Sequence, residues 1–314
     1  IYTVHQTVGW EGTEFIADFD VNISESGQTY RYLINNAKFE SYIKIVKVDS
    51  ETGKTIPYEG AGFEIYNADG EKMTMMYSYP SPTAIDVFYT NSEGYLITPE
   101  VLPYGEYSLV EVQAPYGYVL DKTPVSFSVS SENAEEENSL TIVKVEKQNT
   151  AQKGKISVHK TGDIFTSVAT ASSAYTNENG EMIVNPTTYT PVFANGDLSG
   201  AVFQITAKED IVTLDGTIRA YAGDVVSEIT TDENGYAETE PLYLGKYEVR
   251  EIKAPYGYVL NNEPKDVELT YAGQEFEVRD TVNTAFENEY QSVRISLSKV
   301  MESDEQFGIL SLIH

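Results

Sequence analysis

The chain contains no cysteine, so it can form no disulfide, no thiolate metal site and no cysteine nucleophile. Its three histidines, His5, His159 and His314, stand far apart, and neither a Ser, His, Asp set nor a metal-ligand spacing emerges. Basic residues are also few, since 21 Lys and Arg stand against 49 Asp and Glu and give a formal net charge of -28. This charge repels nucleic acid and anionic lipid, so we expect neither as a partner.

Long apolar runs are missing as well. No segment approaches the roughly 18 residues that span a bilayer, so we expect no membrane insertion. The first residues, IYTVHQTVGW, lack the pattern of a signal peptide, and an exported protein with this sequence would be an internal fragment. What the chain has in abundance is 24 Tyr among many Val, Ile and Thr, which favours strands over helices. With 314 residues, we expect two or more all-β domains, each with its own core.

A repeat organises the sequence. The ten residues from Glu111, EVQAPYGYVL, return at Glu251 as EIKAPYGYVL with eight identities, which chance does not explain. Other residues recur in step with this motif. Asn149 and Asn288 each lie eleven residues before a lysine, Lys160 and Lys299, just as Asn36 lies eleven residues before Lys47. The order is therefore Lys, Glu, Asn and then Lys again.

This period divides the chain into four parts. Residues 1–40 are the C-terminal part of a preceding repeat, in which Gln6 takes the place of the motif Glu, and TYRYLINNAKF is expected to form a strand. Residues 41–152 and 153–291 are complete repeats, and 292–314 start a further one. The acidic stretch SENAEEEN in the first repeat is interpreted as a solvated loop. The second repeat carries an insertion at about 163–198, which we expect to be a loop or hairpin.

Each of the recurring lysines shares a strand face with apolar residues. In SYIKIVKVD, strand alternation places Ile43, Ile45 and Lys47 on one face, and Lys160 and Lys299 have the same parity in their own strands. One lysine of this kind could sit at a strand end with its charged head in water. Three in the same register, each with an Asn upstream, favour burial.

A Lys, an Asn and a Glu buried together in a β-sandwich can react with one another. Burial favours the neutral amine of the lysine and the protonated form of the carboxyl group. The amine is a nucleophile, the Asn side-chain carbonyl is an electrophile, and a protonated Glu can polarise that carbonyl and pass a proton to the departing ammonia. Because the fold holds the groups together, an intramolecular isopeptide bond can form without a separate enzyme.

Each complete repeat carries four features in order: the lysine of KVD or KTG on a first strand, GAxF on the next strand, ExxAPxGY, and a final Asn. In these features each repeat resembles the collagen-adhesin B-type domains of Gram-positive surface proteins and pilins. These are also called SpaA-like or prealbumin-like domains. The resemblance implies tandem Ig-like, prealbumin-like β-sandwiches with Lys47–Asn149 and Lys160–Asn288 bonds. It implies that Glu111 and Glu251 each act as the catalytic acid/base of the bond in their own repeat. Glu64 and Glu248 are lower-ranked alternatives by strand parity. Gln6, Asn36 and Lys299 correspond to the Glu, Asn and Lys of the complete repeats, but no complete Lys, Glu and Asn set includes them in this chain.

The resemblance also implies the function and the location. We expect a structural stalk on the cell surface, anchored to the cell wall in the full-length protein, with neighbouring repeats as partners and no cofactor or metal. Its chemistry would be self-cross-linking without turnover, so we do not expect an enzyme. The alternative is an adhesin module that binds a host or extracellular ligand through the insertion after Lys160, where Tyr175, Tyr189 and Phe193 are expected to be exposed. Neither the pilin linkage motif nor an LPxTG-type sorting signal is visible in the sequence.

Overall fold

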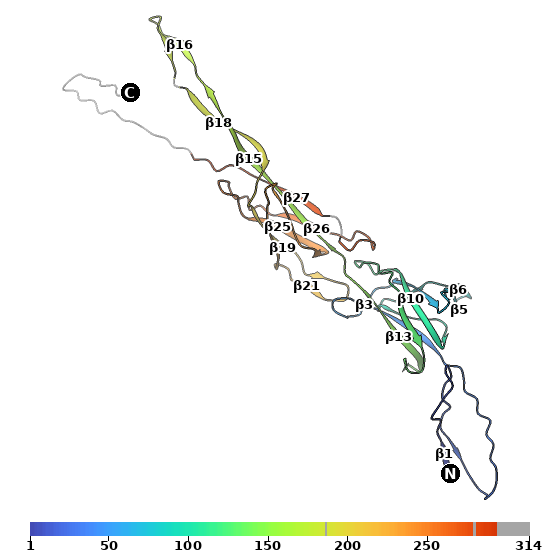
Figure 1. The fold of residues 1–314 in the computed structure, drawn as a ribbon. Coiled ribbons are helices and arrows are strands. Elements are labelled where there is room, and N and C mark those ends of the chain that lie inside the picture. Colours follow the sequence, from blue (N-terminus) through green and yellow to red (C-terminus); the bar gives the residue numbers. More distant parts are fainter. Residues whose placement is uncertain (186, 279–280, 294–314) are drawn as a thin grey trace.

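The computed structural model describes residues 1–314 except 186, 279–280 and 294–314. Every regular element in the described residues is a β-strand, as the composition predicted, and two sets of sheets follow one another along the molecule (Figure 1). We call residues 41–152 the first unit and residues 153–291 the second unit.

The first unit is built from two facing sheets. One has the order β12-β13-β3-β8, with β9 also pairing with β3, and the other has the order β11-β10-β4-β7. Their strands are β3 (Glu40–Asp49), β4 (Gly62–Asn67), β7 (Phe88–Tyr89), β8 (Tyr95–Ile97), β9 (Leu102–Pro103), β10 (Gly105–Gln113), β11 (Val125–Val129), β12 (Ala134–Glu137) and β13 (Leu140–Asn149). A small hairpin, β5 (Met75–Tyr77) and β6 (Thr83–Ile85), lies beside them. The apolar residues between the two sheets form one core.

Strands β3 and β13 are parallel neighbours, although most of the unit separates them in sequence. The parity of β3 is as expected, because Ile43, Ile45 and Lys47 are all 0 % exposed. Since the chain enters the unit at β3 and leaves it at β13, this pair of strands connects the unit to the rest of the molecule.

The second unit repeats the plan. One sheet has the order β22-β19-β25-β26, and in the other β15 pairs with β18, with β23 and, in parallel, with β27. The strands are β14 (Lys153–Gly154), β15 (Ile156–Ala171), β19 (Val202–Ala207), β20 (Ile211–Val212), β21 (Ile218–Ala220), β22 (Val225–Thr230), β23 (Tyr236–Glu238), β24 (Leu242–Tyr243), β25 (Gly245–Lys253), β26 (Lys265–Leu269) and β27 (Val282–Asn288). A second apolar core fills this unit.

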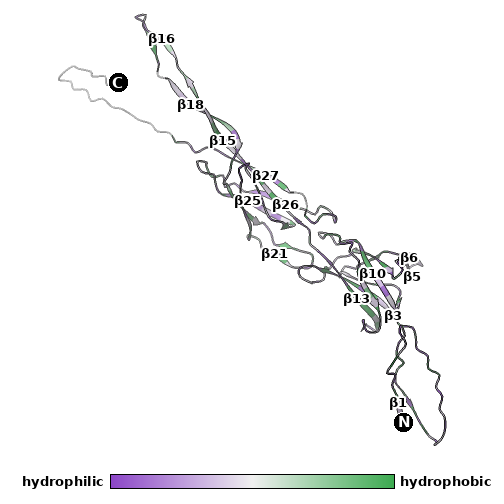
Figure 2. Ribbon diagram, viewed as in Figure 1, coloured by the Kyte–Doolittle hydropathy of each residue, from purple (hydrophilic) through white to green (hydrophobic). Residues whose placement is uncertain are grey.

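The insertion is a long β-hairpin, which we call the arm (residues 163–197). β15 runs out of the second unit and pairs with β18 (Thr188–Asp197), and β16 (Ala174–Thr176) pairs with β17 (Met182–Val184) near the tip. Figure 1 shows the arm projecting from the end of the second unit, and apolar residues recur along it (Figure 2). Tyr175, Tyr189 and Phe193 are exposed there.

Two local expectations are wrong. The acidic stretch after β11 is not all loop, because residues 134–137 form β12 and pair antiparallel with β13. Charged side chains are compatible with this position because β12 is an edge strand with one solvated side. In the N-terminal segment, β1 (Tyr2–Val4) pairs with β2 (Phe19–Val21), but no strand forms over residues 30–37. A strand needs a hydrogen-bonded neighbour, and among the described residues these join no ladder, although the Ala37 carbonyl accepts one hydrogen bond from the Glu14 N–H.

The two units meet at a polar junction. The Asp49 carboxylate, 1 % exposed, accepts hydrogen bonds from the Tyr118 hydroxyl and from Arg219 Nη2, both at 3.0 Å. Arg219, on β21 of the second unit, also contacts Glu51 Oε2 at 2.7 Å and lies over the Tyr243 ring. These contacts link the two units through ion pairs and hydrogen bonds of Arg219.

Candidate functional site

The first candidate site lies between the two sheets of the first unit. Lys47 comes from β3, Asn149 is the last residue of β13, and Glu111 reaches across from β10 in the facing sheet. Lys47 and Glu111 are 0 % exposed and Asn149 is 2 % exposed. Three polar side chains that are far apart in sequence are thus brought together in the interior.

Hydrogen bonds hold this trio around the glutamate. Lys47 Nζ donates to Glu111 Oε1 at 2.7 Å, and Asn149 Nδ2 donates to Glu111 Oε2 at 2.6 Å. Asn149 Nδ2 also donates to the Val119 carbonyl at 2.6 Å. Asn149 Oδ1 is buried and has no hydrogen-bond partner in the described part of the chain. The amide oxygen is therefore not held by the protein groups that hold the amide nitrogen.

Burial changes the charge of the lysine. Loss of hydration lowers the pKa of Lys47 to about 8, although Glu111 raises it by its charge and its hydrogen bond. A considerable fraction of neutral amine is therefore present at mildly alkaline pH. The centroid of the buried Phe63 ring lies 5.5 Å from Lys47 Nζ.

The second unit buries the same three residue types, but their hydrogen bonds differ. Lys160 and Glu251 are 0 % exposed, and Asn288, at the end of β27, is 2 % exposed. Here Lys160 Nζ donates directly to Asn288 Oδ1 at 2.6 Å, and Asn288 Nδ2 donates to Glu251 Oε1 at 2.9 Å. Burial lowers the pKa of Lys160, and the charge of Glu251, whose Oε1 lies 3.6 Å from Lys160 Nζ, opposes this. The nucleophile thus already contacts the amide that it would attack.

The repeated motif builds the wall of each site. After β10 and β25 the chain turns at Gly117 and Gly257, whose φ angles of +79° and +87° strain any other residue. The turn leads to Asp121 and Asn261, whose backbone N–H groups donate to the motif glutamates at 3.1 and 2.9 Å. The sequence analysis missed these two donors. Their common spacing of ten residues from the motif Glu could have identified them.

The N-terminal segment keeps part of this geometry. Gln6 Oε1 accepts from the Ile16 N–H at 2.9 Å and from Asn36 Nδ2 at 3.3 Å, and Asn36 Nδ2 also donates to the Glu14 carbonyl at 2.7 Å. Ile16 and Glu14 lie ten and eight residues after Gln6, just as Asp121 and Val119 lie ten and eight residues after Glu111, whereas Asn36 is closer to Gln6 in sequence than Asn149 is to Glu111. Gln6 and Asn36 are therefore brought together as equivalents of Glu111 and Asn149. Lys299 lies outside the described residues.

The lower-ranked acids are not brought into the sites. Glu64 contacts Tyr66 and Lys72, and Glu248 contacts Arg250, on the outer faces of their strands. Strand parity had suggested Glu64 and Glu248, but parity alone does not show which face of a strand packs against the opposite sheet. Within the described ranges, no group of His, Asp and Glu could hold a metal ion, and no helix could cross a membrane.

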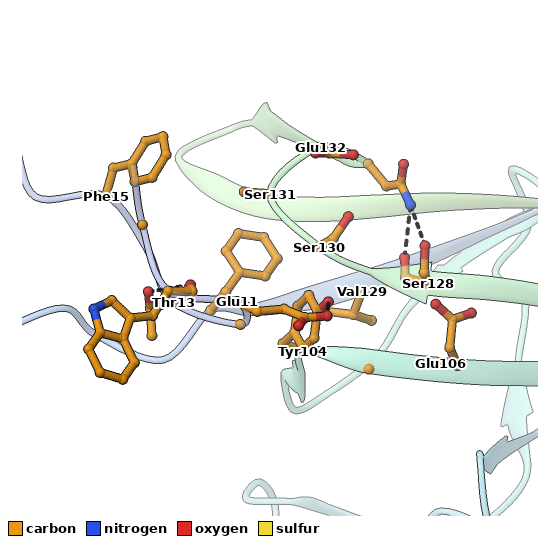
Figure 3. A pocket seen from close by; sticks show the side chains of 16 residues that line it. Glu11, Thr13, Phe15, Tyr104, Glu106, Ser128, Val129, Ser130, Ser131 and Glu132 are labelled. Carbon is orange, nitrogen blue, oxygen red and sulfur yellow. Dashed lines mark hydrogen bonds between the residues drawn. The ribbon is translucent and has the colours of Figure 1, made fainter. Parts of the chain in front are cut away.

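Cavities give solvent access to both amides. Asn149 and Asp121 line a surface cavity of about 280 Å³, and Asn288 and Asn261 line one of about 630 Å³. A further cavity of about 700 Å³ opens between residues 9–15 and the first unit (Figure 3). Its lining includes Glu11, Glu106 and Glu132, and it contains no lysine, so it is not a further site of the same kind.

Comparison with known proteins decides the family. The model of the SpaA prealbumin-like fold domain matches residues 41–148 and 193–284. The chain belongs to this family. The gap between the two matched segments contains the first strand of the second unit and most of the arm.

Parts of the chain are also similar to individual proteins. A segment of 86 residues is 31% identical to the trypsin-resistant surface T6 protein of Streptococcus pyogenes serotype M6, covering 27% of this chain and 15% of that protein. Among solved structures, the Bacillus anthracis TIE protein is 23% identical over 81% of this chain and 35% of that chain, with a TM-score of 0.45. The minor pilin GBS52 of Streptococcus agalactiae is 16% identical over 82% of this chain and its whole length, with a TM-score of 0.29. The chain thus spans a minor part of the first two of these proteins.

Proposed function

We propose that this chain is a stalk segment of a Gram-positive surface protein, and that each unit is closed by an isopeptide bond. The bonds join Lys47 to Asn149 and Lys160 to Asn288. Glu111 and Glu251 transfer the protons. The observation that carries this proposal is the convergence, twice in one chain, of a fully buried Lys, Glu and Asn within hydrogen-bond distance.

The reaction balances without an added reagent. One proton passes from the Lys47 ammonium to Glu111, which leaves a neutral amine beside a carboxylic acid. The amine attacks Cγ of Asn149, Glu111 gives its proton to the amide nitrogen, and the C–N bond breaks so that ammonia leaves. The Glu111 carboxylate then takes the second proton of the attacking nitrogen and ends as a carboxylic acid. The product is a neutral secondary amide, so a buried ion pair disappears. The cavity beside Asn149 offers a route by which ammonia reaches solvent.

The arrangement of strands supports the stalk role. β3 enters the first unit and β13 leaves it, so tension on the chain pulls on these two strands. A bond between Lys47 and Asn149 carries that load covalently and shields the residues between them. By analogy with a disulfide that closes a loop of about 100 residues, each bond adds about 4 to 5 kcal/mol to the free energy of unfolding.

The relatives support the class and the location. One is described as a trypsin-resistant surface protein and another as a minor pilin, which favours a structural protein outside the cell. We infer that the chain is displayed on the cell surface, that cell-wall anchoring belongs to the full-length protein, and that neighbouring repeats are its partners. We also propose the boundaries 1–40, 41–152, 153–291 and 292–314 for the repeats.

The test is the intact mass of the purified chain under denaturing conditions. We expect a deficit of two ammonia molecules against the mass computed from the sequence. Lys47→Ala and Lys160→Ala should each reduce the deficit to one. Lys44→Ala is a matched control, because Lys44 lies on the same strand as Lys47 but points away and pairs with Glu137.

The outcome separates the alternatives. A full mass in the unmodified chain would remove the covalent mechanism and leave a repeat protein held by its cores alone. A deficit that survives both lysine substitutions would assign the bonds to other residues. Peptide mapping of the cross-linked fragments then identifies the joined side chains.

A further inference from the structure

The two candidate sites differ in the residue beside the reactive lysine. In the parallel ladder between β3 and β13, the partner of Lys47 is Lys147, which is 2 % exposed. In the ladder between β15 and β27, the partner of Lys160 is Phe286. The first site therefore has a second buried amine on the neighbouring strand, where the second site has an aromatic ring.

Lys147 is tied to the segment that orients the acid. Its Nζ donates to Asp121 Oδ2 and to the Thr123 carbonyl, both at 2.8 Å. The backbone N–H of Asp121 is the group that donates to Glu111 Oε2. Lys147 thus fixes the short turn of residues 121–123, and the turn fixes the carboxyl group that takes the proton.

The second site holds the corresponding turn without a cation. Asn261 takes the place of Asp121, and its side chain donates to the Glu287 carbonyl at 3.3 Å. Its backbone N–H still donates to Glu251. The ion pair between Lys147 and Asp121 is therefore an addition in the first unit and not a requirement of the fold.

The charge of Lys147 also acts on Lys47. The charged groups around Lys47 are Glu111 on β10, Asp121 after it and Lys147 on β13. Burial is the largest cause of the lowered pKa of Lys47. Glu111 and Asp121 raise that pKa, whereas Lys147 lowers it further. A positive neighbour disfavours a second ammonium, so it increases the fraction of neutral amine.

We propose that Lys147 is a positioning residue for the Lys47–Asn149 bond, which holds the turn that orients Glu111 and presents a second positive charge to Lys47. This inference rests on the proposed cross-linking. It predicts that removing the charge of Lys147 changes the pH dependence of the first bond and leaves that of the second bond unchanged, because the cation that acts on Lys160 is a different residue, Lys265, whose Nζ lies over the Phe286 ring.

The experiment follows both bonds in one chain. The full chain is obtained unfolded and not cross-linked in denaturant. It is then diluted into native buffer at a series of pH values on both sides of about 8 and quenched at successive times. Intact mass and peptide mapping measure how much of each bond has formed. In Lys147→Met, we expect the first bond to form about threefold to tenfold more slowly at neutral pH and its pH midpoint to move upward. The second bond, in the same molecules, serves as the internal control and should keep its rate.

Two further variants separate positioning from folding. Lys147→Arg keeps the charge and the donors, so it should restore most of the rate of the first bond. The double variant Lys147→Phe with Asp121→Asn copies the pair of the second site, and it should shift the pH midpoint upward even if Lys147→Met folds poorly. The proposal would be overturned if Lys147→Met formed the first bond at an unchanged rate and with an unchanged pH midpoint. It would also be overturned if Lys147→Met formed that bond more slowly at the same pH midpoint and Lys147→Arg did not restore the rate. The absence of ammonia loss in the unmodified chain would instead refute the cross-linking itself.

Discussion

Replacing Lys47 by Met tests how much the first unit depends on its cross-link. The substitution removes the nucleophile but keeps an apolar side chain of similar length in a site that is 0 % exposed. Without the bond between residues 47 and 149, the unfolded chain regains the freedom of a loop of about 100 residues, which corresponds to about 4 to 5 kcal/mol. For a unit of this size, the loss lowers the midpoint of thermal unfolding by about 15 to 30 °C.

Differential scanning calorimetry measures this effect, with the second unit as a reference in the same scan. The expected result is one transition that moves down and one that stays, together with a mass deficit reduced by one ammonia. Lys44→Met is the matched control, and since its ion pair with Glu137 is partly exposed, it should change stability by less than about 1 kcal/mol. A Lys47→Met chain that loses the bond but unfolds within a few degrees of the unmodified chain would refute the claim that the bond carries stability.

Four other changes have defined outcomes. Glu111→Gln and Glu251→Gln should each abolish one bond, seen as a deficit of one ammonia, because an amide cannot accept and return the proton; two bonds in either variant would contradict this role. In an Asn149→Ala chain, Lys47 stays an amine whose pKa of about 8 lies below its unfolded value of 10.5, so the unfolded state binds more protons between these pH values. Urea unfolding should then show stability rising with pH in that window, and a flat profile would argue against a buried lysine. Arg219→Ala should broaden the distances between the two units, measured with labels on introduced cysteines, while leaving both bonds intact; an unchanged distribution would mean that other contacts fix the junction. Replacing residues 164–196 by a short turn should preserve both bonds and the stability of the second unit, and loss of the second bond would show that the arm supports the site.

Much of the local architecture could be predicted from the sequence. The alternation in SYIKIVKVD placed Lys47 with Ile43 and Ile45, and the structure buries all three. The composition excluded disulfides and favoured strands, because these properties depend on residue types alone. The repeated motif also identified Lys, Glu and Asn as a set, since the same order of these residues, with the same spacing from each Asn to the next Lys, recurs in both repeats.

The local failures have a common cause. Residues 134–137 form an edge strand despite their charges, and residues 30–37 form no strand despite their β-branched and aromatic content. In both cases pairing depends on whether a neighbouring strand is available, which is a property of the fold and not of the segment. The sequence motif already ranked Glu111 above Glu64, and the structure places Glu111 beside Lys47 and Glu64 beside Tyr66.

The sequence by itself therefore determined the strand content, the repeat and the identity of the candidate reactive residues, because all of these follow from residue type and spacing. The tertiary structure alone decided which atoms meet. It placed Lys147 beside Lys47 through a parallel ladder between strands about 100 residues apart, and it joined Arg219 to Asp49 across the junction. Such contacts depend on strand register and on the packing of distant segments, and no local pattern encodes either of them.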